Sequence, residues 1–332
     1  MKNFAYARPA SLRDAAEAAA ADGAHVVAGG TTMVDLMKIG VLEAETLVSL
    51  SGLSGLSGHE VGAERLRFGA LSTMAAVADD PKVVQAFPAL SEALWKAASP
   101  QLRNVATLGG NILQRTRCPY FRDAAYSQCN KRSPGSGCAA LDGGETTLHA
   151  ILGGSNACAA MYPGDFAQAL VAFDAEVRTQ GADGGRTIPF AKLHVRPGDR
   201  PEVETVLKPG EIVTEISLAV IPAMANSHYL KARDRESYAF AAASAAVGVE
   251  MDGDAVRDVR IGLGGVASTP WRATAAEASL KGKPLTEETA RAAGRIAFED
   301  AEPLEGSAYK IALGADVVAG ALMQVKSRMG AK

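Results

Sequence analysis

The chain has 332 residues, more than a single compact core usually holds, which favours two or three domains. Its 34 basic and 37 acidic residues leave a net charge of −3, too small for a general attraction to nucleic acid or anionic lipid. The most apolar uncharged stretch, 237–249, has 13 residues, fewer than the roughly 20 that a membrane-spanning helix needs. We therefore expect no nucleic-acid partner and no membrane insertion.

The first nine residues carry positive charge without an apolar segment behind it and without a twin arginine. A secretory signal needs such a segment, so we expect any export to depend on a partner that carries the signal. The partner then determines the location of the chain. We expect the periplasm if the partner has a twin-arginine signal and the cytoplasm if it has none.

The first 60 residues alternate between helical and strand periodicity, which is typical of an α/β unit. The predicted helices and strands lie in turn at 11–21, 25–27, 32–39 and 46–49. A second unit begins with a strand at 66–70 and a helix capped by Ser72, and a further helix covers 90–98. Regular periodicity is absent from 115 to 154, and so long a loop needs something to organise it.

Regular elements resume at 166–172, 176–179 and 212–220, and Pro222 marks a boundary. The last 110 residues are typical of a separate α+β unit, with strands on both sides of a turn at 252–254 and helices at 286–299 and 308–329. The sequence therefore predicts an N-terminal α/β part at 1–57, a second α/β part at 58–222 with a loop inserted at about 115–158, and a C-terminal α+β domain at 223–332.

Two glycine-rich turns indicate a dinucleotide site. In the first, a predicted strand that includes Val26 and Val27 runs through Ala28-Gly29-Gly30-Thr31-Thr32 into a helix. Glycines let the chain pass close to a diphosphate, and free N–H groups at a helix N-terminus bind it. The second turn, 107–111, has the same character. Neither turn has the Rossmann spacing.

One segment, 262–267, does match the Rossmann pattern G-x-G-x-x-A. That pattern needs a helix to begin within it, whereas Pro270 disfavours helix at Thr269. We expect no nicotinamide site there. The five histidines are isolated and no hydrolase motif is present, so we assign no catalytic residue to this chain.

The four cysteines all lie in one part of the chain, at Cys118, Cys129, Cys138 and Cys158. Gaps of 10, 8 and 19 residues separate them, so the close pairs of zinc ribbons and bacterial ferredoxins are missing. Residues 101–133 carry six basic residues and one acid, and nearby cations stabilise an anionic cluster. We predict one [4Fe-4S] cluster on the four thiolates, with a zinc ion, or separate buried or disulfide-bonded cysteines, as alternatives.

Four segments, 28–32, 99–111, 163–165 and 264–270, occur in one order along the chain. Together they resemble the FAD-binding medium subunit of the xanthine dehydrogenase family of molybdenum hydroxylases over essentially the whole chain. Most members lack the cysteines between the second glycine turn and the segment 163–165. In this respect the chain resembles the [4Fe-4S]-containing FAD subunits of the periplasmic aldehyde oxidoreductase branch.

The resemblance implies a two-part FAD-binding domain of the vanillyl-alcohol-oxidase-like (PCMH) type and a C-terminal α+β domain of the CO-dehydrogenase flavoprotein type. It implies noncovalent FAD, with the diphosphate on the two glycine turns. The cofactor-binding residues implied in this way are Val26, Val27, Ala28, Gly29, Gly30, Thr31, Thr32, Met33, Val34, Thr107, Gly110, Asn111, Asp165 and Lys231.

The resemblance also implies partner subunits. A large subunit would carry the molybdenum cofactor and oxidise an aldehyde, a small subunit would carry [2Fe-2S] centres, and electrons would leave through the FAD of this chain to an external acceptor. Two other functions stay open, namely a four-cysteine metal-binding scaffold without redox turnover and a self-sufficient FAD oxidase. Flavin absorbance distinguishes the first, and an aldehyde assay of the isolated chain tests the second.

Overall fold

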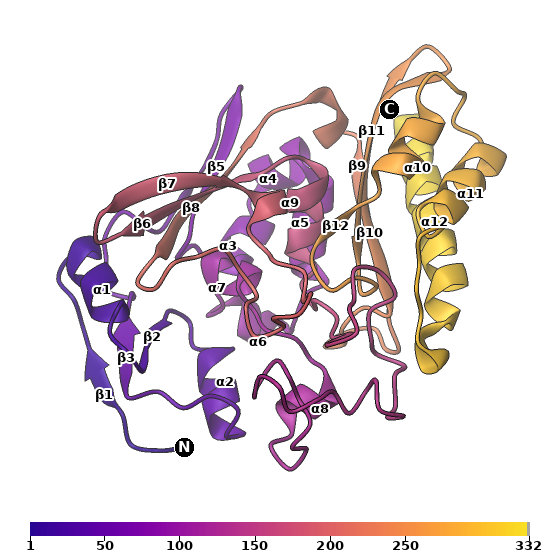
Figure 1. Cartoon of the computed structure of the whole chain (residues 1–332). Helices are drawn as coiled ribbons and strands as arrows, with labels where there is room; N and C mark the ends of the chain where they lie inside the picture. The colour runs from indigo at the N-terminus through magenta and orange to yellow at the C-terminus, as the bar shows by residue number, and fades with distance from the viewer. Residues whose placement is uncertain (331–332) are drawn as a thin grey trace.

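The computed structural model describes residues 1–330, which form three sheets in succession along the chain (Figure 1). The first sheet is parallel in the order β1-β3-β2, with strands Ala5–Ala7 (β1), Thr46–Ser49 (β3) and Ala24–Val27 (β2). Helices Leu12–Ala19 (α1) and Met33–Lys38 (α2) lie between these strands in sequence. Ser11 caps α1 by accepting a hydrogen bond from the Asp14 N–H at 3.1 Å. The alternating periodicity predicted these elements except β1.

The second sheet is antiparallel in the order β4-β5-β8-β6-β7. Its strands are His59–Val61 (β4), Arg65–Gly69 (β5), Ile212–Ala219 (β8), Glu176–Gly181 (β6) and Gly184–Pro189 (β7). The helices of this part are Met74–Ala78 (α3), Pro81–Ala86 (α4), Pro88–Trp95 (α5), Pro100–Arg103 (α6), Leu108–Ile112 (α7) and Phe166–Ala172 (α9). Sheet and helices share one apolar core, in which Phe68, Leu94, Phe166 and Ile216 are fully buried. Such burial is the main force that holds the layers together.

The cap of helix α3 differs from the sequence prediction. Thr73, not Ser72, occupies the N-cap and accepts a hydrogen bond from the Ala76 N–H at 3.3 Å. The Ser72 hydroxyl instead donates to the Gly58 carbonyl at 2.7 Å. Both residues are suitable caps by type, and the neighbouring turn at Gly58 decides between them.

The third sheet is antiparallel in the order β12-β11-β10-β9. Its strands are Trp271–Arg272 (β12), Ala255–Gly264 (β11), Ala243–Asp252 (β10) and Ser227–Ala232 (β9). Helices Thr274–Leu280 (α10), Glu287–Ile296 (α11) and Tyr309–Gly330 (α12) lie on one side of it (Figure 1). The predicted turn and both predicted helices are confirmed. The Rossmann-like segment 262–267 is buried at the end of β11, and β12 follows it instead of a helix.

The segment 305–330, which includes α12, is long and apolar enough to cross a membrane by length and composition alone. The sequence prediction did not identify it, because charged residues such as Lys310 and Asp316 interrupt its apolar run. In the structure α12 packs against β9, β10 and α11, with Val318 and Leu322 fully buried. Burial in the C-terminal core accounts for its apolar composition.

The segment 115–154 contains a single short α-helix, Pro119–Arg122 (α8), and is otherwise built of turns. The Arg132 guanidinium holds it together by donating to the carbonyls of Tyr120 at 2.9 Å and Phe121 at 2.8 Å. The segment lies between α2 and the C-terminal sheet (Figure 1). Three 3-10 turns, Phe190–Lys192, Pro222–Met224 and Glu305–Ser307, complete the secondary structure of the described residues.

Candidate functional site

The first glycine-rich turn touches the chain just before the second turn. A Cβ atom on Gly29 would lie 2.1 Å from the Val105 carbonyl oxygen, so only glycine permits this close approach. Gly30 has a φ of +73°, in the left-handed region that favours glycine. The first turn therefore needs both glycines for its own backbone geometry and for its contact with the chain that leads into the second turn.

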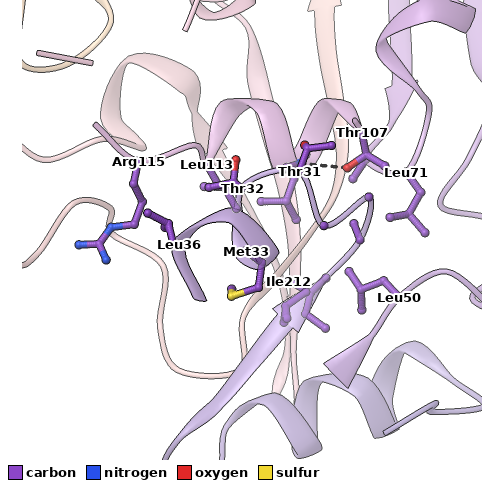
Figure 2. Close-up of a pocket in the computed structure, with 18 of the residues that line it drawn as sticks. Thr31, Thr32, Met33, Leu36, Leu50, Leu71, Thr107, Leu113, Arg115 and Ile212 are labelled. Atoms are coloured by element: carbon purple, nitrogen blue, oxygen red, sulfur yellow. Dashed lines mark hydrogen bonds between the residues drawn. The ribbon is translucent and has the colours of Figure 1, made fainter. Parts of the chain in front are cut away.

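A cavity of about 290 Å³ opens beside both turns (Figure 2). Gly30, Thr31 and Thr32 line it from the first turn, and Thr107 and Gly110 line it from the second. The remaining wall is largely apolar and includes Met33, Leu36, Leu50, Leu71, Leu113 and Ile212. Among residues 1–330, no protein atom forms a hydrogen bond with the side-chain hydroxyl of Thr31 or Thr32, so both hydroxyls are available to a ligand.

The second turn forms the start of helix α7. Thr107 is its N-cap, and its hydroxyl oxygen accepts a hydrogen bond from the Gly110 N–H at 3.2 Å. A Cβ atom on Gly110 would meet only that same oxygen, at 3.0 Å. Gly110 thus presents open backbone to the cavity, while the Thr107 hydroxyl oxygen already accepts a hydrogen bond within the turn.

A second cavity, of about 720 Å³, shares Thr31, Thr32 and Gly110 with the first. Its size lies within the range of roughly 300 to 1,000 Å³ that is typical of ligand pockets. The Asn111 side-chain oxygen at its wall is buried and has no hydrogen-bond partner among the described residues. A buried polar atom without a partner is costly, so a ligand that donates a hydrogen bond would stabilise this wall.

The second cavity ends at a buried ion pair between Asp165 and Lys231. The Lys231 ammonium donates to one oxygen of the Asp165 carboxylate at 2.8 Å and to the Lys96 carbonyl at 3.0 Å. The Tyr229 hydroxyl donates to the other carboxylate oxygen. Burial first, and then the Asp165 charge, raise the pKa of the Tyr229 hydroxyl well above its ordinary value. The carboxylate is therefore fixed by two donors from the C-terminal sheet.

Most residues expected at a cofactor lie at these two cavities. Those that line one or both of them are Val26, Ala28, Gly29, Gly30, Thr31, Thr32, Met33, Thr107, Gly110, Asn111 and Asp165. Three others do not line either cavity. Val27 is buried in a small core with Met37, Val34 lies behind Gly30 on α2, and Lys231 reaches the site only through Asp165.

The four cysteines, which lie within the stretch 118–158 of the sequence, are also close together in the folded chain. Cys129 and Cys138 face one another across an antiparallel β-bridge. Cys129 and Cys158 lie close enough to Cys118 for their charges to raise its pKa. The charges of Cys129 and Cys138 likewise raise the pKa of Cys158. Burial is the main cause that raises the pKa of the Cys118 thiol to about 12, and it also raises the pKa of Cys158.

The arrangement of the cysteines differs from that of a site for a single metal ion. Among residues 1–330, no group of three or more His, Cys, Asp or Glu side chains could hold such an ion. A tetrahedral ion with sulfur at about 2.3 Å needs its thiolates in close contact with one another. A [4Fe-4S] cluster with four cysteine ligands binds each of them at a different iron atom, so its thiolates lie farther apart. The four cysteines match a [4Fe-4S] cluster in the type and number of the donor atoms.

Sequence reasoning missed several residues at these sites. Arg115 lines the first cavity and pairs with Glu204, which also binds Lys131 at 3.0 Å. Tyr229 binds Asp165, and His149 places its Nε2 atom 3.3 Å from the sulfur of Cys118. Arg115 entered the sequence analysis only as part of the local positive charge. Tyr229 and His149 gave no signal, because their roles depend on segments distant in sequence.

Both parts of the chain match known families. Residues 2–222 match the FAD binding domain in molybdopterin dehydrogenase, and residues 227–325 match the CO dehydrogenase flavoprotein C-terminal domain. The chain is 41% identical over 332 residues to the aldehyde oxidoreductase FAD-binding subunit PaoB of Escherichia coli (strain K12). The alignment covers 99% of this chain and 100% of that protein. It is 26% identical over 326 residues to the carbon monoxide dehydrogenase medium chain of Hydrogenophaga pseudoflava, and the alignment covers 96% of each protein.

Solved structures have the same fold. A chain of the carbon monoxide dehydrogenase from Hydrogenophaga pseudoflava that lacks the Mo-pyranopterin moiety aligns with a TM-score of 0.76 at 26% identity, over 98% of both chains. A chain of quinoline 2-oxidoreductase from Pseudomonas putida 86 aligns with a TM-score of 0.75 at 22% identity, over 98% of both chains. At that identity the second likeness concerns the fold alone.

Proposed function

Since the chain belongs to the FAD-binding medium subunits of the molybdenum hydroxylase family, we propose that it is the electron-transfer subunit of a molybdenum-dependent aldehyde oxidoreductase. The family membership confirms the predicted fold class, an FAD-binding domain followed by a CO-dehydrogenase flavoprotein C-terminal domain. The similarity to the PaoB subunit over the full chain supports an aldehyde as the substrate of the complex.

The observation that carries the proposal is the pair of adjoining cavities that meet at Thr31, Thr32 and Gly110. Gly30 and Gly110 would give the diphosphate of FAD close access to the backbone, and the hydroxyls of Thr31 and Thr32 would bind its oxygens. Asn111 and Asp165 would bind polar atoms of the cofactor in the larger cavity. Bound FAD supplies a carrier that accepts two electrons together and releases them one at a time.

The experiment that tests this function is purification of the full chain and analysis of its flavin. We expect about one FAD per chain, released by acid or heat because it is not covalently attached. A colourless protein with bound metal would instead support the metal-binding scaffold. Aldehyde oxidation by the isolated chain would support the self-sufficient oxidase, whereas we expect none without a molybdenum subunit.

We further propose that Cys118, Cys129, Cys138 and Cys158 hold one [4Fe-4S] cluster. The common location of the four cysteines and the burial of Cys129 and Cys158 support it. A bound cluster supplies a one-electron centre. Five basic residues lie in the same segment, of which Arg115 and Lys131 pair with Glu204, Arg117 and Arg122 pair with Asp35, and Arg132 binds backbone carbonyls. Iron and sulfide analysis of anaerobically prepared protein tests this, and stoichiometric zinc without iron would refute it.

The proposed complex contains a large subunit with the molybdenum cofactor and a small subunit with [2Fe-2S] centres. Similarity to medium subunits and medium chains supports such partners. We propose that the assembled complex is exported to the periplasm by a twin-arginine signal on a partner, with the cytoplasm as the alternative. Cell fractionation after deletion of the partner's signal tests this, because continued periplasmic accumulation of the chain would contradict it.

A further inference from the structure

Lys310 is a fully buried lysine near the start of helix α12. Its side chain has 0% exposure, and its ammonium donates one hydrogen bond, to the Gly265 carbonyl at 2.8 Å. Among residues 1–330, no carboxylate forms an ion pair with it. Burial is the sole cause that lowers its pKa, to about 8. A buried ammonium without an anion is costly to the fold.

The position of Lys310 in helix α12 adds to this cost. Lys310 lies in the first turn of the 22-residue helix. The N-terminus of a helix carries a partial positive charge, so a cation at that end is repelled and an anion is attracted. Both burial and the helix dipole therefore favour a negative charge near Lys310.

A buried histidine connects this region to the cysteines. The Lys310 charge acts on His149, which is 1% exposed. The His149 Nε2 atom lies 3.3 Å from the sulfur of Cys118, and its Nδ1 atom has no hydrogen-bond partner among the described residues. A His149 tautomer with its hydrogen on Nε2 can donate a hydrogen bond to the Cys118 sulfur at this distance.

The segment that carries His149 is hydrogen-bonded on two sides of Lys310, to the end of β11 beside Gly265 and to the chain just before α12. The N–H groups of Ile151 and Leu152 donate to the Val266 carbonyl, at 2.8 and 3.1 Å. The Gly306 N–H donates to the Thr146 hydroxyl at 3.0 Å, just before α12 begins. Lys310, His149 and Cys118 therefore belong to one rigid contact between the C-terminal domain and the cysteine loop.

We propose that Lys310 and His149 are positioning residues that compensate the negative charge of the thiolate-bound cluster on the Cys118 side. The inference rests on the proposed function, in that it requires the cluster to be present. Lys310 supplies a buried positive charge, and His149 donates a hydrogen bond to the Cys118 sulfur. Hydrogen bonds and positive charge at cluster sulfurs favour the reduced, more negative state. The C-terminal domain therefore takes part in tuning the cluster.

The test is Lys310→Met in the full chain, prepared both without iron and after anaerobic reconstitution with ferrous iron and sulfide. Without iron, we expect the variant to have a higher melting temperature than the wild type, because an uncompensated buried charge is removed. Reconstitution with iron and sulfide should raise the melting temperature of the variant by less than it raises that of the wild type. The midpoint potential of the variant's cluster, measured in an EPR-monitored titration, should be more negative. A structural role alone would destabilise both forms equally and leave the potential unchanged.

Lys326→Met is the matched control. Lys326 lies on the same helix and also donates to a backbone carbonyl, that of Leu285 at 2.6 Å. It is 16 residues from Lys310, about 24 Å along a helix, so we expect a wild-type potential. His149→Leu should lower the midpoint potential, whereas His149→Gln, which keeps an N–H donor, should restore part of the shift.

The outcomes separate the inference from the proposed cluster. A wild-type chain that takes up no iron would refute the cluster and this inference with it. A wild-type chain that takes up iron, with Lys310→Met showing the same potential and the same rise in melting temperature, would overturn the inference alone. Equal shifts in Lys310→Met and Lys326→Met would also overturn it.

Discussion

The Asp165 carboxylate and the Lys231 ammonium form a buried ion pair at 2.8 Å although 66 residues separate them. Asp165 lies at the N-cap of α9, and Lys231 lies on β9 of the C-terminal sheet. Their side chains are 5% and 1% exposed, respectively. Since Asp165 also lines the larger cavity, this pair connects the proposed cofactor site to the contact between the two matched domains.

We predict that Asp165→Asn destabilises the fold by about 3 to 5 kcal/mol, because it leaves the Lys231 charge buried and unpaired. Urea unfolding would measure the change. Asp174→Asn is the matched control, since Asp174 also pairs across the chain, with Arg260 and Arg272, but is 61% exposed. For an exposed pair we expect about 1 kcal/mol or less. Equal losses in both variants would contradict the prediction.

Gly110→Val tests the proposed diphosphate site. Valine adds a branched side chain at the wall shared by both cavities, and we expect FAD to bind at least about tenfold more weakly, or ~1.4 kcal/mol. Gly30 is a poorer test, because its φ of +73° strains any other residue there. Gly52→Val, where a Cβ atom would meet no atom within 4 Å, is the control. Full flavin content in Gly110→Val would show that the diphosphate lies elsewhere.

Cys138→Ser should abolish the proposed cluster. We expect the iron content of the wild-type protein to approach about four atoms per chain and to be lost in the variant. Because metal binding at such a site contributes to folding, limited proteolysis should then cut the segment 115–154 faster. The substitution changes neither Arg132 nor the Tyr120 and Phe121 carbonyls that it binds, so faster cleavage would report on the loss of the cluster. Unchanged iron content would remove Cys138 from the ligand set.

His194 should make stability depend on pH in a defined window. Burial lowers its pKa from 6.5 to about 4, so the unfolded chain binds more protons between these values. The free energy of unfolding therefore falls as pH is lowered from about 6.5 to about 4, and the contribution is complete above pH 6.5. Urea midpoints at pH 7.5 and pH 5 should differ less in His194→Gln than in the wild type. The same difference in both proteins would contradict this assignment.

The assembled complex should reduce one-electron acceptors such as ferricyanide, a quinone or a small redox protein faster than NAD⁺. The Rossmann-like segment 262–267 is buried, and a Cβ atom on Gly262 would lie 2.2 Å from the Gln168 carbonyl oxygen. Gly262 and Gly264 serve packing against α9, Gly265 packs against Ala241 and Ala242, and none of them is free to contact a nicotinamide cofactor. Steady-state rates with saturating aldehyde and each acceptor would decide, and comparable turnover with NAD⁺ would contradict the prediction.

The sequence by itself determined the features that depend on neighbouring residues. The Gly29-Gly30 turn between β2 and α2, the hairpin at 252–254 and the long helix α12 follow from local backbone preferences and hydrophobic periodicity. The clustering of the four cysteines also gave their common location, because they lie within one stretch of the chain. Caps were less certain, as Thr73 in place of Ser72 shows.

Only the tertiary structure decided which charged and polar groups face one another in the interior. The pairing of Asp165 with Lys231 and the proximity of Lys310 to His149 join segments that are 66 or more residues apart. No local pattern encodes such a contact, because each partner has an ordinary sequence environment. Burial then gives these contacts their strength, since charges interact far more strongly away from water, and burial is a property of the folded chain as a whole.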